Sequence, residues 1–265
     1  MTVRSVTLLH GFLGLPSSMS TFARALRNAL GVPVRAVLLP GHGHSPWGLE
    51  AKSFDDAVTA LRTRVFTREP DGEVLIGYSM GGRLALGLAA LLPGLERVLA
   101  VGAHLGFEDA SEESVRAAAD DERAKQVLER GIDRFAEGWA REPIFATQRE
   151  LPEAIQREQA RTRASHTERG IAWALTTLGT GRKPDLRSRL AKSGARVELI
   201  AGEHDSKFVQ HHRSLDRLRL PQVRCSTVPS CGHNPFLEDP IGALAAIRAA
   251  LTSTRTNHSL SINGA

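Results

Sequence analysis

The sequence predicts an α/β fold, a mostly parallel central sheet flanked by helices. Two observations predict it: short, nearly continuous apolar runs recur along the chain, and segments with helical spacing separate them. Continuous apolar runs are typical of strands buried on both faces of a parallel sheet. Strand–helix alternation is the pattern of an open α/β sheet. At 265 residues, the chain is long enough for one large domain with a substantial core.

The predicted elements follow one another from the first residues onward. Six apolar runs are predicted as strands: VRSVTLLH (3–10), VRAVLL (34–39), EVLIG (73–77), RVLAVG (97–102), RVELIAG (196–202) and VRCSTV (223–228). Four segments have clear helical spacing: 20–30, 54–66, 82–92 and 240–251. Most of these helices lie between two strands, as the crossover connections of a parallel sheet require.

The alternation breaks between residues 106 and 182. This segment is rich in Ala, Arg and Glu, keeps helical spacing, and contains no convincing strand. We therefore predict a helical insertion that forms a lid over the carboxyl ends of the strands, with 1–105 and 183–252 as the α/β core. Residues 253–265 are polar and without periodicity, so we expect a disordered tail.

Composition excludes several classes of function. The net charge of +5 comes from scattered basic residues rather than from a block, which favours a small anionic substrate over a nucleic acid. The sequence has no recognisable signal peptide and no apolar run long enough to span a membrane, so a cytoplasmic protein without a membrane partner is expected. Two cysteines, Cys225 and Cys231, suit a reducing compartment and lack the spacing of a metal site.

The segment GYSMGG (77–82) follows a predicted strand and opens a predicted helix. This is the setting of a nucleophile elbow, in which Gly77 and Gly81 permit a tight turn and Ser79 stands exposed at the helix N-terminus. Backbone N–H groups and the helix dipole favour negative charge at that point. A glycine-rich turn with an incidental serine is the alternative reading.

Two further residues complete a triad in the chain order Ser, acid, His. Asp205 follows the strand at 196–202, and His233 follows the strand at 223–228. Alone, Asp205 would be read as a helix cap and His233 as a loop histidine. Together, they predict that Asp205 orients the imidazole and that His233 takes the proton of Ser79.

HGF (10–12) follows the first strand and supplies the opposite wall of the predicted site. The N–H groups of Phe12 and Met80 are predicted to form an oxyanion hole, although a plain turn would use the same residues. His42 and His44 in the segment LLPGHGHS (38–45) are interpreted as loop-structuring residues.

Arg83 lies four residues after Ser79, on the same face of the predicted helix. An arginine beside the nucleophile suits a planar carboxylate, which it can bind with two hydrogen bonds. The alternative is a salt bridge on the helix surface. Arg116 and Arg163, in the insertion, could bind substrate or could simply belong to a solvated helix face. Trp139 could line a binding site or simply pack in a core.

These motifs together resemble the α/β-hydrolase superfamily across almost the whole chain. Four of them, GYSMGGR (77–83), GAHLGF (102–107), WAREPIFA (139–146) and GEHDSKF (202–208), further resemble the 2-succinyl-6-hydroxy-2,4-cyclohexadiene-1-carboxylate (SHCHC) synthase family of menaquinone biosynthesis. The resemblance implies a lyase that eliminates pyruvate from 2-succinyl-5-enolpyruvyl-6-hydroxy-3-cyclohexene-1-carboxylate, with no metal and no organic cofactor. It also implies a site made of the triad, the oxyanion hole and the substrate-binding residues Arg83, Arg116, Arg163, Tyr78 and Trp139.

The sequence departs from this family at three positions expected to line the site or its rim. His166 stands where Asn is usual, Lys183 where Gln is usual, and Phe236 where His is frequent. We expect these changes to affect the choice of substrate more than the triad. Two alternatives stay open: an ester or thioester hydrolase acting through an acyl-serine, and a non-catalytic receptor on the same fold. The protein is expected to be a monomer or a small homo-oligomer.

Overall fold

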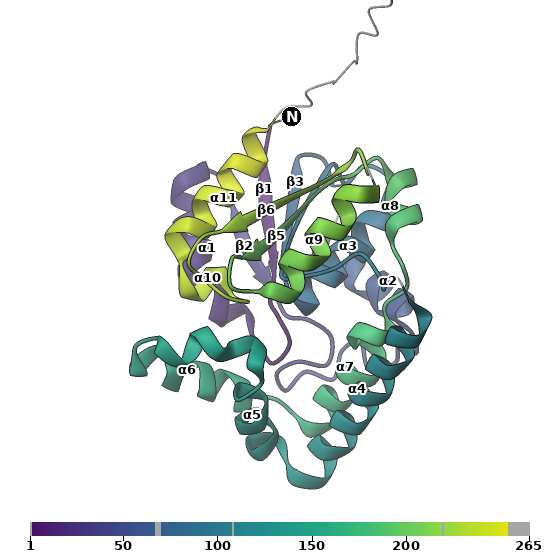
Figure 1. Cartoon of the computed structure of the whole chain (residues 1–265), viewed down its shortest axis with the longest axis vertical. Coiled ribbons are helices and arrows are strands. Elements are labelled where there is room, and N and C mark those ends of the chain that lie inside the picture. The colour runs from purple at the N-terminus through teal and green to yellow at the C-terminus, as the bar shows by residue number, and fades with distance from the viewer. Residues whose placement is uncertain (1, 67–69, 108, 219, 254–265) are drawn as a thin grey trace, which may run out of the picture.

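The six predicted strands are all present and form one sheet in which every pairing is parallel, in the order β2-β1-β3-β4-β5-β6 (Figure 1). The computed structural model describes residues 2–66, 70–107, 109–218 and 220–253. The strands are β1 (Ser5–Leu9), β2 (Val34–Val37), β3 (Glu73–Tyr78), β4 (Arg97–Val101), β5 (Arg196–Gly202) and β6 (Val223–Val228). Because the strands are parallel, all six carboxyl ends meet at one edge of the sheet.

The helices around the sheet are more numerous than the sequence pattern predicts. The four predicted helices are α1 (Ser20–Leu30), α2 (Phe54–Val65), α3 (Met80–Leu91) and α11 (Pro240–Thr252). Helices α8 (Arg187–Ser193), α9 (Ser206–Leu218), the short α10 (Pro235–Glu238) and the 3₁₀ turn η1 (Pro16–Met19) complete the part that surrounds the sheet.

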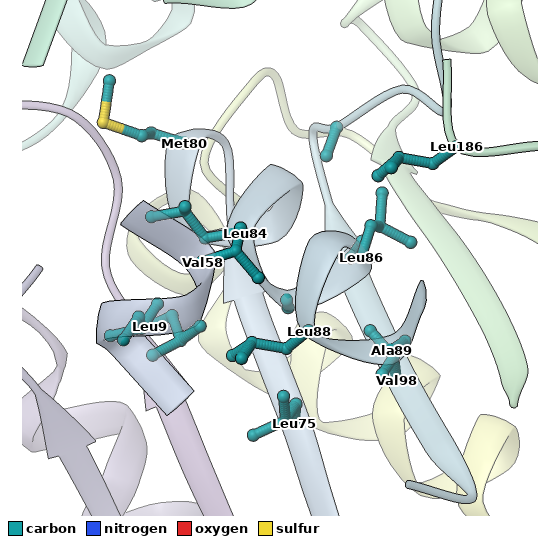
Figure 2. Packing of buried hydrophobic residues seen from close by; sticks show 14 of the residues in the cluster. Leu9, Val58, Leu75, Met80, Leu84, Leu86, Leu88, Ala89, Val98 and Leu186 are labelled. Carbon is teal, nitrogen blue, oxygen red and sulfur yellow. The ribbon is translucent and has the colours of Figure 1, made fainter. Parts of the chain in front are cut away.

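Alternation along the strands divides the core into two clusters, one on each face of the sheet. Val74 and Ile76 of β3 belong to the cluster covered by α1 and α11. Leu75 faces the opposite way, into the cluster covered by α2, α3, α8 and α9. Figure 2 shows how α3 is embedded there, with leucine side chains among residues of β1, α2, β3 and β4. The result is a rigid, two-sided support for the segment that follows Ser79.

The segment between β4 and β5 is helical, and its described residues contain no strand. It comprises α4 (Ala110–Arg130), α5 (Ile132–Ala140), η2 (Pro143–Glu150), α6 (Glu153–Ala164), α7 (Glu168–Leu178) and η3 (Thr180–Arg182), followed by α8. Helices α4 to α7 gather beyond the carboxyl edge of the sheet (Figure 1). The division of the chain into a core and a lid at residues 105 and 183 stays a prediction. So does the tail, of which residues 254–265 lie outside the described part of the chain.

A third apolar cluster joins this helical segment to the sheet. Leu13, in the loop after β1, packs with buried residues of α4, α5 and α7. The cluster contains Leu13, Ala124, Val127, Ile132, Phe135, Ile171, Ala172 and Leu175. The loop that carries Phe12 is therefore fixed from the side of the helical segment as well as from the sheet.

Candidate active site

Ser79 occupies a strained turn between β3 and α3. Its φ of 50° and ψ of −110° lie in a region that residues with a Cβ atom rarely adopt. The glycines around it are required by close backbone contact. A Cβ added at Gly77 would lie 2.2 Å from the carbonyl oxygen of Gly81, and one added at Gly81 would lie 2.3 Å from that of Leu9. The sequence thus folds into a sharp elbow that projects the serine hydroxyl from the helix N-terminus.

The structure brings the three predicted triad residues together. The Nε2 atom of His233 lies 3.2 Å from Ser79 Oγ, and Nδ1 lies 2.6 Å from Asp205 Oδ2. Asp205 and His233 are 5% and 3% exposed, so water does not separate the pair. An ionised Asp205 accepts the Nδ1 proton, which leaves the lone pair of Nε2 directed at the serine hydroxyl.

Aromatic rings and one glycine enclose the imidazole of His233. The ring of Phe208 stacks on it at 5.2 Å, and the rings of Tyr78 and Phe145 lie 5.3 and 6.0 Å away, measured between centroids. Gly102, directly after β4, has no side chain and so leaves room for the ring. An added Cβ would lie 2.7 Å from His233 Cε1. The imidazole therefore has one well-defined place in the site.

The two residues predicted to form the oxyanion hole, Phe12 and Met80, line the same cavity as Ser79. Met80 is the first residue of α3, so its N–H is among the helix amides that have no partner within the helix. The loop with Phe12 runs close by, since a Cβ added at Gly11 would lie 3.6 Å from the Cβ of Ser79. This arrangement can stabilise negative charge on an oxygen next to the serine.

One cavity of about 340 Å³ collects almost all of the predicted site residues. Asp205 is the exception and lies behind His233, as an orienting group should. The predicted residues that line the cavity are Ser79, His233, Phe12, Met80, Arg83, Arg116, Arg163, Tyr78 and Trp139. Its charged lining is unequal, with five cations (Arg83, Arg116, Arg123, Arg163 and Lys207) and two carboxylates (Asp120 and Glu142).

Arg83 is buried at the floor of this cavity. Its Nη2 donates to the carbonyl of Leu178 at 2.9 Å, while its Nε is buried without a hydrogen-bond partner. Burial lowers the pKa of Arg83 to about 10, with the nearby Arg116 acting in the same direction and Asp120 opposing it. Arg83 thus remains a cation at neutral pH and is available to an anion in the cavity.

Arg116 reaches the cavity from α4 and is held by a neighbour on the same helix. Asp120, 1% exposed, accepts from Arg116 Nε at 3.2–3.3 Å and from Arg123 Nη1 at 3.5 Å. It also accepts from the backbone N–H of Thr180 at 3.0 Å, which ties α4 to η3. Arg123 bonds to Glu142 at 3.2 Å and lies over the ring of Trp139, so these cations are fixed rather than freely moving.

Arg163 reaches the same cavity from α6. Its Nη2 donates to Gln148 Oε1 at 2.9 Å, and its guanidinium lies 5.1 Å over the ring of Phe145. Tyr78 also forms a hydrogen bond with Gln148, and burial raises the pKa of its hydroxyl well above the usual range. Tyr78 is therefore a neutral hydrogen-bonding group in this site at any physiological pH.

Three residues differ from the usual SHCHC synthase sequence and were expected to line the cavity or its rim. Two of them do not line the cavity. Lys183 is 1% exposed and donates from Nζ to the carbonyls of Leu105 and Pro184, behind the cavity rather than in it. His166 is also buried, and its Nδ1 accepts from the N–H of Gly43 at 2.8 Å. Only Phe236 lines the cavity as expected. The positions of Lys183 and His166 in the chain do not determine where their side chains point, because packing decides that direction.

The loop histidines are structural, in agreement with the interpretation of His42. His42 Nε2 accepts from the N–H of Leu13 at 3.3 Å, and the rings of His10 and His166 lie edge-on to it at 5.1 and 5.4 Å. Burial lowers the pKa of His10 to about 3 and that of His166 to about 4. All three imidazoles are consequently neutral and support the loop behind the predicted oxyanion hole.

Sequence reasoning missed several residues that line the cavity. Asp120 and Arg123 could have been found, because their spacing from Arg116 and from each other is that of ion pairs on one helix face. Lys207 lies inside the motif GEHDSKF (202–208), which supports the family resemblance. Gln148 and Asn234 carry no local signal, because each reaches the cavity through the packing of distant segments.

Within residues 2–66, 70–107, 109–218 and 220–253, no helix is both long and apolar enough to cross a membrane. Nor do they contain three or more His, Cys, Asp or Glu side chains grouped so that they could hold a metal ion.

The parallel sheet, the elbow and the triad define a member of the alpha/beta hydrolase family, whose sequence model matches residues 8–247. Closer relatives narrow this assignment. The putative 2-succinyl-6-hydroxy-2,4-cyclohexadiene-1-carboxylate synthase of Bacillus subtilis is 32% identical over 242 residues, which are 89% of this chain and 86% of that one. The chain belongs with these SHCHC synthases, as the sequence motifs predict.

Two other comparisons agree. The synthase of Escherichia coli K12 that carries the same name is 28% identical over 247 residues, 93% of each chain. The structure of MenH from S. aureus superposes with a TM-score of 0.85 at 30% identity, covering 95% of this chain and 94% of that one. The similarity thus extends through the helical segment as well as through the sheet.

Proposed function

We propose that the protein is a 2-succinyl-6-hydroxy-2,4-cyclohexadiene-1-carboxylate synthase, a lyase that eliminates pyruvate from 2-succinyl-5-enolpyruvyl-6-hydroxy-3-cyclohexene-1-carboxylate. The observation that carries the proposal is the combination of a Ser–His–Asp triad with five cations in one cavity. A hydrolase of uncharged esters has no use for these cations, whereas the three carboxylates of this substrate require them.

Ser79 begins the reaction as a base. Its hydroxyl proton passes to His233 as the serine oxygen removes the ring proton next to the succinyl carbonyl. The electron pair of that C–H bond forms an enolate, whose oxygen is stabilised by the N–H groups of Phe12 and Met80. Asp205 stabilises the imidazolium that forms.

Collapse of the enolate completes the elimination. The ring double bond shifts to give the conjugated diene, and the bond between the ring carbon and the enolpyruvyl oxygen breaks. The departing group leaves as the enolate of pyruvate and takes up one proton to become pyruvate. The proton count balances because the one removed from the ring is returned from His233 or solvent. Ser79 forms no covalent bond to the substrate.

The cations hold the carboxylates that do not react. Arg83 and Arg116 reach the cavity from α3 and α4, and Arg163 reaches it from α6, where it is accompanied by Gln148 and Tyr78. Because the groups come from separate elements, they can bind carboxylates at different ends of the substrate. Trp139 supplies an apolar wall, with the ring of Phe12 packed edge-on at 5.0 Å.

The decisive experiment measures pyruvate release from the purified precursor by wild type, Ser79→Ala and Arg163→Met. Ser79→Ala is expected to lose about 10³-fold or more in kcat. Arg163→Met is expected to raise KM by about 10- to 100-fold, because one charge-assisted contact is worth about 1.5–3 kcal/mol. Arg161→Met is the matched control, since Arg161 is on the same helix with a side chain 76% exposed.

The result also separates this function from ester or thioester hydrolysis. An acyl-serine hydrolase would turn over a chromogenic short-chain ester quickly and would increase in mass by the acyl group during turnover. Fast ester hydrolysis without pyruvate release from the precursor contradicts the proposal. Equal pyruvate release by wild type and Ser79→Ala contradicts the mechanism.

The proposal includes the setting of the reaction. The substrate is a small polycarboxylate, which agrees with the surplus of cations in the cavity. We place the activity in the cytoplasm, with a small molecule rather than a nucleic acid as partner, because the two free cysteines suit a reducing compartment and the basic residues are scattered.

A further inference from the structure

Lys183 is a basic residue buried behind the cavity, on the chain between η3 and α8. Its side chain is 1% exposed and donates from Nζ to the carbonyl oxygens of Leu105 at 2.6 Å and Pro184 at 2.9 Å. Burial of an ammonium group is costly, because its charge is removed from water. The two contacts do not require that charge, since an uncharged amide, which is usual at this position in SHCHC synthases, could donate to the same oxygens.

Arg83 is the charged group that acts most strongly on Lys183. Burial and then the Arg83 guanidinium lower the pKa of Lys183 to about 7. His104, on the loop after β4, is 5% exposed, and burial together with both of these cations lowers the pKa of its imidazole well below the usual range. Three basic groups from separate elements thus form one buried cluster, in which His104 is neutral and Arg83 and Lys183 repel one another.

The carboxylates near this cluster do not neutralise it. Asp185, before α8, and Glu113, on α4, favour the charged form of Lys183, while Arg187 opposes it. Asp185 is itself bonded to Arg187 Nε at 2.9 and 3.0 Å. Among the residues that the structure describes, neither Lys183 nor Arg83 forms an ion pair with a carboxylate. Arg83 lines the cavity, and its buried Nε has no hydrogen-bond partner, so an anion bound there would supply the missing negative charge.

From this arrangement we propose that Lys183 is a specificity-determining residue, which supplies a second positive charge behind Arg83 when a substrate carboxylate is bound there. In the empty site, repulsion between the two groups favours the uncharged amine of Lys183. A carboxylate at Arg83 offsets that repulsion, so Lys183 takes up a proton from solvent and its ammonium group attracts the carboxylate from behind the guanidinium. The site thereby favours a substrate that is charged at this end, although Lys183 does not touch it.

The effect on binding has a defined dependence on pH. A bound carboxylate raises the pKa of Lys183 above its value of about 7 in the empty site. Between these two pKa values the complex holds more protons than the free protein, so affinity falls as the pH rises through that window. Coupling between two charges at this range is about tenfold. We therefore expect the KM of wild type to rise by about five- to tenfold from pH 6 to pH 8.5.

Lys183→Gln provides the first test, because it removes the charge and keeps a donor for the two carbonyl oxygens. At pH 6 it is expected to raise KM by about tenfold without changing kcat. At pH 8.5 its KM should be close to that of wild type, whose amine is then largely uncharged. Lys192→Gln is the matched control, since it removes one positive charge from an exposed position on α8 and should leave KM unchanged at both pH values. A residue with only a structural role would lower the melting temperature without this dependence on pH.

A double-mutant cycle tests whether Lys183 acts on the carboxylate held by Arg83. In an Arg83→Met background, Lys183→Gln should change KM at pH 6 by less than about threefold, because the two residues share one partner. In an Arg163→Met background the effect of about tenfold should persist, since Arg163 reaches the cavity from α6. Equal effects of Lys183→Gln in both backgrounds overturn the inference. So does a KM ratio between Lys183→Gln and wild type that is the same at pH 6 and pH 8.5.

Calorimetry with succinate as the probe tests the inference without any reaction, and also decides it if Arg83→Met does not fold. Binding at pH 7.5, measured in buffers with different ionisation enthalpies, gives the number of protons taken up. Wild type is expected to take up roughly half a proton more than Lys183→Gln. Equal uptake by the two proteins overturns the inference.

The inference rests on the proposed function only for the identity of the substrate. If wild type released no pyruvate from the precursor, the proposed function would fail, while proton uptake with succinate would still show whether Lys183 responds to an anion at Arg83. If wild type released pyruvate but took up no more protons than Lys183→Gln, the inference alone would fail.

Discussion

Replacement of Gly102 by alanine tests whether the place of the imidazole is as narrow as the structure indicates. Gly102 directly follows β4 with a φ of +60°, and an added Cβ would lie 2.7 Å from Cε1 and 3.0 Å from Nδ1 of His233. Two effects are expected: backbone strain, because alanine disfavours positive φ, and displacement of the ring.

The size of each effect follows from these distances. Positive φ costs alanine roughly 1–2 kcal/mol. Carbon atoms in ordinary contact are about 3.5 Å apart, so the ring must move by about 0.8 Å. If that movement is away from Ser79, the Nε2 to Oγ distance of 3.2 Å grows beyond hydrogen-bond range. A shift of this size at the reacting groups lowers kcat by about 10²-fold.

Gly31→Ala separates the two effects. Gly31 ends α1 with a φ of +68°, and an added Cβ there would have no atom within 4 Å. Both variants should lose similar stability from strain, measured as the free energy of unfolding in urea, but only Gly102→Ala should lose kcat in the pyruvate-release assay. A folded Gly102→Ala enzyme with kcat within about threefold of wild type would refute the reasoning, as would an equal loss in Gly31→Ala.

Three further predictions concern stability. Ser79→Gly and Ser79→Ala should both be inactive, but the glycine variant should unfold with a free energy higher by about 1 kcal/mol, because glycine tolerates the φ of 50°; equal stability in urea would argue against strain. Burial lowers the pKa of Lys183 from 10.5 to about 7. Between these two pH values the unfolded chain binds one more proton than the folded chain, so the free energy of unfolding should rise with pH from 7 towards 10.5, relative to that of Lys183→Gln. Urea unfolding at pH 7 and 9 checks this, and a constant difference between the two proteins contradicts it. Burial lowers the pKa of His166 to about 4, so the unfolded chain binds more protons below pH 6.5 and stability should fall from pH 6.5 to 4. His166→Asn should lose less over that range, whereas parallel pH curves would count against the assignment.

The parts of the site that lie next to strands could be predicted from the sequence. Ser79, Asp205 and His233 each follow an apolar run, and the carboxyl ends of parallel strands must meet. The register of the sheet then brings the three together without further information. Arg83 is predictable for a related reason, because helix periodicity places it on the face of Ser79.

The parts that depend on packing could not be predicted. The bounds of α7 within the predicted helical insertion are one example, because seven of its eleven residues, between Gly170 and Leu178, are buried against other elements. Lys183 and His166 were expected near the rim because of their neighbours in sequence, yet both turn inward to backbone partners. Gln148 reaches Arg163 and Glu238 through contacts between separate elements, which no local pattern records.

The unequal charge of the cavity has a consequence for the end of the reaction. The carboxylates that the cations would bind take no part in the bond changes, so the diene product and pyruvate keep all of them. Contacts that are equally strong before and after the chemical step lower KM but do not accelerate that step. They also retain the products. Release of the two anions, through movement of the helices above the cavity, is therefore expected to limit turnover at saturating substrate, with inhibition by added pyruvate as its visible sign.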